Sequence, residues 1–364
     1  GSNPVISMST QTSLVCLLIN PRPHKSAQST SLPDGTGYTD LMANRRLTEQ
    51  QKRRIDHNET KRRKSSMAGH NDDALGTIVA RYSKTAIVRD EVGNTHKCHL
   101  RPNLAHLVAG DRVFWLHSDT GAAVSAQLER RSELNRPDAR GQLKAVAANV
   151  DLIAVVIAPA PEPFANLIDR YLVAAHIAGI EAVVILNKAD LLAINPESRV
   201  LLNRYKEIGL TVLEIDPSAS ATRNLNRLLG DRTTVFVGQS GVGKSSIINR
   251  LLPNEDLRVG ALSEGVLKGR HTTTTAEVFQ RPEGGCIIDS PGIREFGLQH
   301  IDPALVAPGF EEFRAFLGQC RFRDCKHLVE KGCAVLAALE RGDIGADRYD
   351  SFVNIVRDIP QKTY

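Results

Sequence analysis

The feature that most constrains the fold is a regular alternation of apolar and amphipathic segments from Val150 onward. The run VDLIAVVIAP is continuously apolar, as strands of parallel sheets are when both of their faces are buried. An amphipathic segment, NLIDRYLVAAHIAG, follows it and ends at Gly179. The alternation continues through strands expected in EAVVILN, LTVLEID and TTVFVG, each followed by a helical pattern. This order predicts a doubly wound α/β sheet with right-handed crossovers.

A glycine-rich stretch follows one of these strands and opens a helix. It reads GQSGVGKS from Gly238 to Ser245 and fits G-x-x-x-x-G-K-[ST] in full. The glycines let backbone N–H groups face phosphate oxygens, and the helix N-terminus adds a positive dipole. Lys244 is expected to bridge the β- and γ-phosphates during catalysis, and the Ser245 hydroxyl to bind Mg²⁺. The predicted phosphate contacts are Gly238, Gln239, Ser240, Gly241, Val242, Gly243, Lys244, Ser245 and Ser246.

The tetrad NKAD, at residues 187–190, stands at the carboxyl end of an apolar strand, where ligands bind in such sheets. The Asp190 carboxylate can accept hydrogen bonds from N1–H and N2–H of guanine, whereas adenine has an acceptor at N1 and no 2-amino group. Asn187 is expected to reach the O6/N7 edge of guanine and to position the phosphate loop. The stem of Lys188 is expected to lie across the ring. The tetrad therefore predicts guanine-nucleotide selection.

Two further segments have the character of nucleotide switches. DSPG, at 289–292, is a D-x-x-G motif that begins at the last residue of the expected strand GGCIID. Asp289 is expected near Mg²⁺ and Gly292 at the γ-phosphate. GRHTTTT, at 269–275, lies where the first switch must be, and either Thr272 or Thr273 should bind Mg²⁺. Because the tetrad precedes the phosphate loop, the order predicts a circularly permuted P-loop GTPase domain over residues 150–300.

A cysteine cluster follows the switch region. Its spacing is C-x4-C-x-H-x5-C, formed by Cys320, Cys325, His327 and Cys333. Three thiolates and one imidazole complete a tetrahedral Zn²⁺ shell with no open position, which predicts a structural site. The alternative is a set of reduced core cysteines beside a surface histidine. Residues 301–364 are predicted to form a C-terminal helical zinc-binding domain.

The segment before the α/β pattern reads as short strands broken by turns. Residues 74–130 predict a small β-barrel, OB-like in type, and residues 131–149 a polar linker. Lys84, Arg89, Lys97, Arg101 and Arg112 would give the barrel a positive surface, with Tyr82, Phe114 and Trp115 as candidates for stacking on bases. The alternative is a barrel that serves only as a spacer.

The positive charge of the chain is concentrated at its start. Residues 1–70 hold 11 Lys and Arg against 5 Asp and Glu, so the rest of a chain of net charge +5 is near neutral. Residues 1–73 are predicted to form a basic, disordered arm, with 1–41 non-native or an extension. Such an arm suits a polyanion, and the alternative is a solubilising tail. No apolar run reaches 18 residues, and the clustered cysteines indicate a reducing compartment, so we expect a cytoplasmic protein without membrane partners.

The combination of basic arm, small barrel, permuted NKAD … GQSGVGKSS … GRHTTTT … DSPG order and Cys₃His tail resembles the RsgA/YjeQ family, the small ribosomal subunit-dependent GTPases. The resemblance extends from about Met42 to the end of the chain. It implies a GTP hydrolase of late 30S maturation, using GTP or GDP with Mg²⁺ and one structural Zn²⁺. It further implies binding to 16S ribosomal RNA through the barrel and the zinc module, and stimulation by the 30S particle. We also expect a monomer.

The catalytic group is less directly indicated by the sequence. In Ras-like switches a glutamine after D-x-x-G orients the attacking water, whereas this chain has Ile293, a hydrocarbon that cannot do so. The resemblance and the local chemistry nominate His271, whose imidazole could hold or polarise the water. The alternative role for His271 is contact with RNA or with the zinc module. A second interpretation of the whole chain is an RNA-binding assembly factor in which the nucleotide is only a conformational lock.

Overall fold

The structure, a computed structural model, describes residues 73–118, 121–138, 142–253, 276–289, 298 and 301–359. Except for Asp73, the predicted basic arm lies outside this range, and so does the expected first switch around His271. Among the described residues, no helix is both long enough and apolar enough to cross a membrane.

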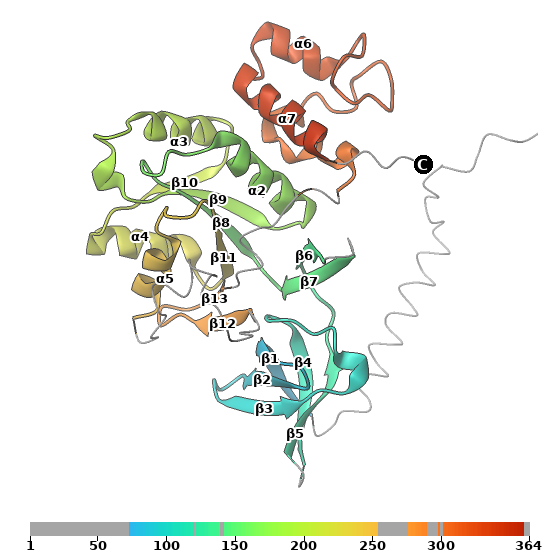
Figure 1. Cartoon of the computed structure of the whole chain (residues 1–364), viewed down its shortest axis with the longest axis vertical. Coiled ribbons are helices and arrows are strands. Elements are labelled where there is room, and N and C mark those ends of the chain that lie inside the picture. Colours follow the sequence, from blue (N-terminus) through green and yellow to red (C-terminus); the bar gives the residue numbers. More distant parts are fainter. Residues whose placement is uncertain are drawn as a thin grey trace, which may run out of the picture. The chain divides into compact units, whose positions relative to one another are not determined.

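Five strands close a small barrel at the start of the described chain (Figure 1). Each strand pairs with its neighbours in the order β1-β2-β3-β5-β4, and β4 pairs back with β1. Ile78, Val88, Val113 and Val124 fill its interior and are fully buried. The predicted OB-like barrel is therefore confirmed. The strands are β1 (Ala74–Arg81), β2 (Thr85–Asp90), β3 (Thr95–His99), β4 (Arg112–Ser118) and β5 (Gly121–Gln127), with a 3-10 turn η1 (Pro102–Leu104) between β3 and β4.

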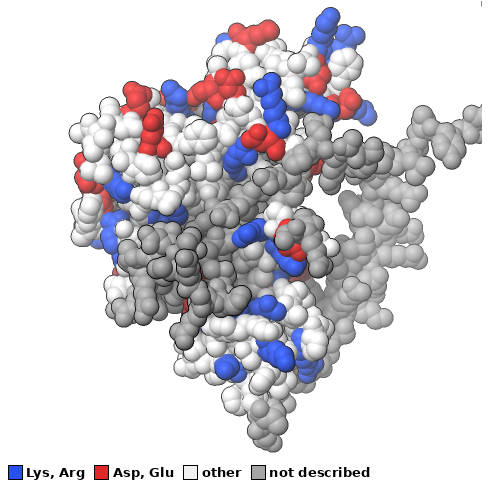
Figure 2. All heavy atoms as spheres, in the orientation of Figure 1, with Lys and Arg blue, Asp and Glu red and all other residues white. Residues whose placement is uncertain are grey.

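The barrel surface is cationic, but its one tryptophan is not available for stacking. Lys and Arg predominate among the charged side chains over the barrel in Figure 2, whereas both signs are mixed elsewhere on this face. Lys84, Lys97, Arg101 and Arg112 are exposed. Trp115 is only 6% exposed and stacks on His96 at a ring separation of 4.2 Å. The prediction that Trp115 could stack on a base is therefore wrong, because the barrel core takes up its ring.

The predicted α/β sheet is present, with the strand order β10-β9-β8-β11-β13-β12. All of these strands run parallel except β12, which is antiparallel to β13. The strands are β8 (Leu152–Ile157), β9 (Glu181–Leu186), β10 (Thr211–Glu214), β11 (Thr233–Val237), β12 (Glu277–Gln280) and β13 (Cys286–Asp289). The helices are α2 (Ala165–Ile177), α3 (Glu197–Glu207), α4 (Ala219–Leu229) and α5 (Lys244–Leu251), with a 3-10 turn η2 (Ala189–Leu191).

Helices cover both faces of this sheet, which explains the unbroken apolar run in β8. Ile153, Val155 and Ile157 pack with residues of α2 and α3 on one face. The alternate residues Leu152, Ala154 and Val156 pack with residues of α4 and α5 on the other. Every residue of β8 is buried, so the strand must be apolar at each position.

The segment predicted as a polar linker is a folded hairpin. Strands β6 (Glu133–Pro137) and β7 (Leu143–Ala148) pair antiparallel, and Leu134 and Ala147 are fully buried in the core below α2. This burial was not predicted because the segment is polar overall, and only alternate side chains of a short hairpin face the core. Asn149 fastens the hairpin end to the barrel, donating from Nδ2 to the carbonyl of Gly110 at 2.8 Å.

The barrel strand β1 also pairs with β12, at Ala80 and Glu277, so that barrel and α/β strands form one continuous sheet. Arg89 reinforces this junction by donating to the carbonyl of Val278 at 3.1 Å. The segments predicted as a barrel at 74–130 and a GTPase domain at 150–300 are thus connected by main-chain hydrogen bonds between β1 and β12 as well as by the hairpin.

The C-terminal module consists of 3-10 turns, the cysteine-rich segment and two helices. Its apolar core is built around three stacked or edge-on aromatic rings, Phe310, Phe313 and Phe352, each at most 1% exposed. The turns are η4 (Pro303–Leu305), η5 (Ala307–Gly309) and η6 (Glu311–Phe313), and the helices are α6 (Ala334–Arg341) and α7 (Ala346–Asp358).

Gly110 provides a test of the junction between barrel and hairpin. Its φ is +89°, and a Cβ at this position would lie 2.1 Å from the Ala148 carbonyl oxygen. We expect Gly110→Ala to destabilise the protein by about 2 kcal/mol or more, from backbone strain plus the clash. Because Trp115 is the one tryptophan of the chain, its fluorescence during urea unfolding reports this loss at the barrel.

The matched control is Gly93→Ala, which has a similar φ of +104° but no atom within 4 Å of the added Cβ. It should cost about 1 kcal/mol, from strain alone. Equal losses in the two variants would show that the close approach to Ala148 has no energetic importance.

Candidate functional site

The predicted nucleotide residues meet at the carboxyl edge of the sheet. The chain leaves β8 towards β9 and β10 on one side and returns to β11 on the other, so the strand order reverses between β8 and β11 (Figure 1). Open α/β sheets bind ligands at such a switch point, outside the carboxyl ends of the strands. The phosphate loop follows β11, and the tetrad follows β9.

The conformation of the phosphate loop depends on its glycines. Gly238, Gly241 and Gly243 all have positive φ, at +136°, +82° and +95°. A Cβ at Gly238 would lie 2.2 Å from the Val156 carbonyl oxygen of β8, so only glycine allows the loop to leave the sheet here. Gly243 caps the N-terminus of α5, whose first residue is Lys244. The Lys244 ammonium donates to the carbonyls of Gly238 and Gln239, at 2.8 and 2.6 Å, and so lies inside the curl of the loop.

The base tetrad grips this loop directly. Asn187 is 5% exposed, and its Nδ2 donates to the carbonyl oxygen of Val242 at 2.9 Å. The Lys188 ammonium donates to the carbonyls of Gly241, at 2.8 Å, and Ala160, at 2.9 Å. A Cβ on Gly243 would lie 2.3 Å from Asn187 Nδ2, so the last glycine of the motif makes room for the tetrad. Two loops that are widely separated in sequence are thereby joined.

Some of the remaining predicted site residues lie within the part of the chain that the structure describes, and others lie outside it. Asp190 is exposed in η2, and Asp289 ends β13 one residue after the register pair Val235 and Ile288, which puts it near the carboxyl edge. Ser240 and Ser246 are exposed, and Ser245 is half-buried in the first turn of α5. His271, Thr272, Thr273 and Gly292 lie outside the described residues.

Two loops at this edge were not identified from the sequence. The loop after β8 supplies the Ala160 carbonyl that holds Lys188. The loop after β10 accepts a hydrogen bond at Ile215 O from Ala189 N, at 3.1 Å, and another at Asp216 O from Arg250 of α5, at 2.7 Å. Neither loop has a recognisable motif, but both follow parallel strands, and that position was the available signal.

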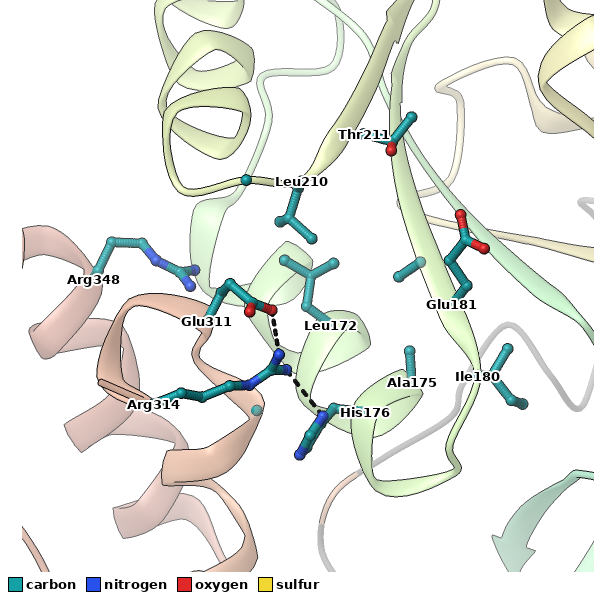
Figure 3. Close-up of a pocket in the computed structure, with 13 residues that line it drawn as sticks. Leu172, Ala175, His176, Ile180, Glu181, Leu210, Thr211, Glu311, Arg314 and Arg348 are labelled. Carbon is teal, nitrogen blue, oxygen red and sulfur yellow. Dashed lines mark hydrogen bonds and ion pairs between the residues drawn. The ribbon is translucent and has the colours of Figure 1, made fainter. Parts of the chain in front are cut away.

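A pocket of about 250 Å³ lies elsewhere, at the amino ends of β9 and β10 (Figure 3). Leu172, Ile180 and Leu210 line it together with charged residues of the C-terminal module. None of the predicted nucleotide residues lines this pocket. We assign the nucleotide site from the converging loops, because a phosphate is bound by an exposed backbone cradle and not by a deep cavity.

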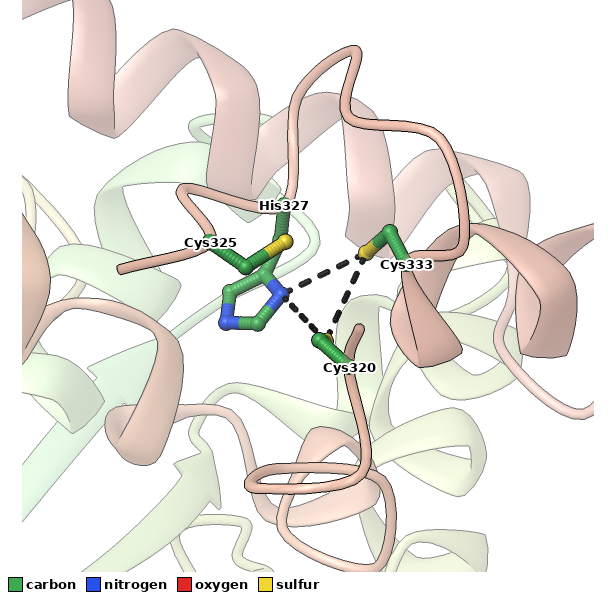
Figure 4. Close-up of side chains that lie close together, drawn as sticks. All are labelled: Cys320, Cys325, His327 and Cys333. Atoms are coloured by element: carbon green, nitrogen blue, oxygen red, sulfur yellow. Dashed lines mark hydrogen bonds between the residues drawn. The ribbon is translucent and has the colours of Figure 1, made fainter. Parts of the chain in front are cut away.

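The predicted metal ligands converge in the C-terminal module (Figure 4). The ligand atoms of Cys320, Cys325, His327 and Cys333 all lie within 4.8 Å of one another. Nδ1 of His327 is 3.5 Å from Sγ of Cys320 and 3.4 Å from Sγ of Cys333, and these two sulfurs are 3.9 Å apart. Zn–S and Zn–N bonds of about 2.3 and 2.0 Å give tetrahedral edges of roughly 3.5–3.8 Å, so the donor set fits Zn²⁺.

Backbone groups around the cluster favour the ligand forms of these side chains. The N–H groups of Ala334 and Leu336 point at the sulfurs of Cys320 and Cys333, at 3.3 and 3.4 Å. Burial lowers the pKa of His327, which favours the neutral imidazole that binds a metal. The Tyr349 hydroxyl donates to the carbonyl of His327 at 2.9 Å and fixes the backbone of this ligand.

Glu330 organises the segment between the ligands, which we call the knuckle (residues 320–333). Its carboxylate accepts hydrogen bonds from the N–H groups of Lys326 and Leu328, at 2.9 Å, and of Val329, at 3.0 Å. Desolvation opposes ionisation, but these donors prevail and lower the pKa of Glu330 to about 2. The carboxylate thus shapes the turn that carries His327.

We expect Glu330→Gln to weaken metal retention, because an amide accepts fewer hydrogen bonds and leaves part of the turn unfixed. Changes beside metal ligands typically cost 10–100-fold in affinity, and we expect roughly a tenfold faster loss of zinc to a chromogenic chelator. Asp324→Asn is the matched control, since this carboxylate of the same knuckle is exposed. If both variants lose zinc at the wild-type rate, Glu330 does not organise the site.

Comparison with known proteins gives consistent relatives. Residues 127–299 match the family model for the RsgA GTPase. The small ribosomal subunit biogenesis GTPase RsgA of Pseudomonas syringae pv. tomato is 51% identical over 300 residues, covering 80% of this chain and 88% of that protein. The protein of the same name from Pseudomonas aeruginosa is 48% identical over 339 residues, covering 89% of this chain and all of that protein.

Solved structures of similar proteins share the fold. YjeQ from Thermotoga maritima is 30% identical, with a TM-score of 0.66 over 79% of this chain and 98% of that chain. YloQ, described as a circularly permuted GTPase, is 27% identical, with a TM-score of 0.64 over 80% of this chain and 98% of that chain. The permuted order predicted from the tetrad and the phosphate loop thus has a structural counterpart.

Proposed function

This chain belongs to the RsgA GTPase family, and from that premise we propose that it hydrolyses GTP in the biogenesis of the small ribosomal subunit. The observation that carries the proposal is the contact of Asn187 and Lys188 with the phosphate loop. Through this contact the groups that read the base and the groups that hold the phosphates form one site. We further propose that the substrate is GTP and that the product, GDP, leaves the same site.

The phosphate loop supplies the binding half of the mechanism. Backbone N–H groups between Gly238 and Ser246, with the N-terminus of α5, hold the phosphates, and Lys244 moves from the loop carbonyls to the β- and γ-phosphates. Ser245, Asp289 and Thr272 or Thr273 are the residues that would hold Mg²⁺, which offsets charge on the phosphates when bound. Water attacks the γ-phosphorus, and the bond to the bridging oxygen breaks. GDP leaves with that oxygen and the electron pair of the bond, while the water oxygen becomes part of inorganic phosphate and its protons stay on the phosphate or pass to solvent.

We propose His271 as the group that orients the attacking water, since Ile293 stands where Ras-like proteins have glutamine. An imidazole can accept a hydrogen bond from water near neutral pH. The proposal for the C-terminal cluster is one structural Zn²⁺, supported by the fit of its four ligand atoms.

The proposed partner is the 30S subunit, contacted through 16S ribosomal RNA during late maturation in the bacterial cytoplasm. The positive charges of the barrel and the knuckle support a polyanionic partner. Lys84, Lys97, Arg101 and Arg112 of the barrel are exposed, and none forms an ion pair with a residue that the structure describes. The same holds for Arg323, Lys326 and Lys331 of the knuckle. The exposed Tyr82 of the barrel and Phe322 of the knuckle add surfaces on which bases can stack.

Base selection tests the site. We expect Asp190→Asn to bind GTP roughly a hundredfold more weakly, because an amide nitrogen would face the N–H donors of guanine, and to prefer xanthosine triphosphate. Binding of fluorescent nucleotide analogues measures this exchange, with Glu197→Gln of α3 as a control at an exposed carboxylate beyond the tetrad. Retained GTP preference in Asp190→Asn would mean that the tetrad does not read the base.

Catalysis is tested at His271. We expect His271→Ala to lower GTP turnover roughly a hundredfold, both alone and with 30S particles, while GTP affinity stays unchanged. Steady-state assays with and without particles make the measurement. Wild-type turnover in both assays would remove His271 from the mechanism. If particles fail to accelerate the wild-type enzyme, the interpretation of the nucleotide as a conformational lock is favoured instead.

A further inference from the structure

The hydrophobic core of the C-terminal module is completed by residues from outside the module. Val173 and Ala174 of α2 belong to the same buried cluster as Phe310, Phe313 and Phe352. The approach is close, since a Cβ at Gly309 would lie 2.8 Å from Val173 Cα. Helix α2 therefore packs into the α/β sheet with one face and completes the core of the metal-binding module with another.

A buried ionic network fixes the same helix to the module. Arg348 of α7 is 9% exposed, and its guanidinium bonds to Asp169 of α2, which is 1% exposed, and to Glu312, at 2.6 Å. The Tyr205 hydroxyl of α3 donates to the same Asp169 carboxylate at 2.7 Å. The guanidinium also lies 4.6 Å from the centre of the Phe310 ring. One arginine thus joins α2, α3, η6 and α7.

Contacts run along the whole length of α2. In its first turn Asn166 donates to the carbonyl and hydroxyl oxygens of Ser351, at 3.1 and 3.0 Å. In its last turn His176 Nδ1 accepts a hydrogen bond from Arg314 of the module at 3.0 Å (Figure 3). Burial and the Arg314 charge lower the pKa of His176, which keeps its imidazole neutral and able to accept. Helix α2 is thus tied to the module at both ends and in the middle.

Such a network holds only one arrangement. Burial raises the pKa of Asp169, and the Arg348 charge opposes this rise. Moving Arg348 away would therefore leave this carboxyl either charged and unpaired in an apolar setting or forced to take up a proton, and both are costly. Breaking a buried pair by removing one partner typically costs 3–5 kcal/mol, far more than breaking an exposed one. The module cannot swing on α2 without losing this network.

The two helices held by Arg348 begin at the loops that form the base side of the nucleotide site. The loop before α2 contains Ala160, whose carbonyl holds the Lys188 ammonium. It also contains Pro161, whose Cδ would lie 3.6 Å from a Cβ added to Gly241 of the phosphate loop. The tetrad itself leads through η2 into α3. Any loosening of α2 therefore reaches the residues that position Lys188 and the phosphate loop.

We propose that Arg348 is a positioning residue that couples the Cys320–Cys333 metal site to the guanine-nucleotide site through α2. The inference rests on the proposed function, because it requires both a bound nucleotide and a bound metal. Coupling between two sites is reciprocal: if metal-dependent docking of the module orders the nucleotide loops, nucleotide binding must stabilise the metal site by the same factor.

The test measures zinc release from the full chain with a chromogenic chelator, with and without saturating GDP. In the wild type, GDP should slow zinc release at least threefold, and ATP should have no effect. In Arg348→Met, zinc release should be faster and GDP should no longer slow it. Arg341→Met is the matched control, since Arg341 forms an exposed pair with Asp343 at the end of α6, and it should keep the full GDP effect.

The outcomes separate this inference from the proposed function. If a fluorescent GDP analogue fails to bind the wild type, the nucleotide site itself is wrong. If the analogue binds but GDP leaves zinc release unchanged, the coupling is overturned and the GTPase assignment stands. If Arg348→Met retains the GDP effect, coupling does not run through this residue. Should Arg348→Met fail to fold, Arg348→Lys, which keeps the charge but not the forked geometry, should show a reduced GDP effect, and an undiminished effect would overturn the proposal.

Discussion

The site depends on one short contact, the hydrogen bond from the Asn187 amide to the Val242 carbonyl. A phosphate loop alone binds any nucleoside triphosphate, and a base-reading tetrad alone binds nothing tightly. The amide joins them with an atom that is buried and therefore costly to leave unpaired. Gly243 permits the contact because no other residue would leave room for Asn187. In the proposed site, guanine selection and phosphate binding would thus be combined by packing, whatever the order of the segments along the chain.

Much of the architecture could be predicted because its physical causes are local. Strand β8 is buried on both faces, and so its sequence is apolar at every position. The glycines of the phosphate loop appear in the sequence because their φ values exclude other residues. The metal cluster was visible because its ligands fall within one short segment, and their atoms indeed lie within 4.8 Å of one another. The OB-like barrel was recognisable from alternating strands with turn residues between them.

The features that escaped prediction arise from contacts between distant segments. Residues 133–148 look polar, yet Leu134 and Ala147 are buried because the hairpin docks on the core beside Ala109. Trp115 was predicted to be available on the surface, but closure of the barrel buries its side chain. The loop containing Ala160 has no motif, since it contributes only a backbone carbonyl. The sharing of α2 between two cores, with Leu172 in one and Val173 in the other, cannot be read from its sequence, which shows only that the helix is apolar over more than one face.

The strand order has a consequence for synthesis on the ribosome. The central strand β8 is made before either β9 or β11, and its second neighbour, β11, follows only after two further strands and three helices. At roughly 5–20 residues per second, one edge of a fully apolar strand waits for seconds without its partner. The nascent protein therefore has an incomplete sheet with an unpaired apolar edge, and it lacks the phosphate loop. It cannot bind a nucleotide until most of the chain has emerged. Incomplete chains consequently do not bind GTP, and the unpaired edge of β8 must be shielded early to prevent aggregation.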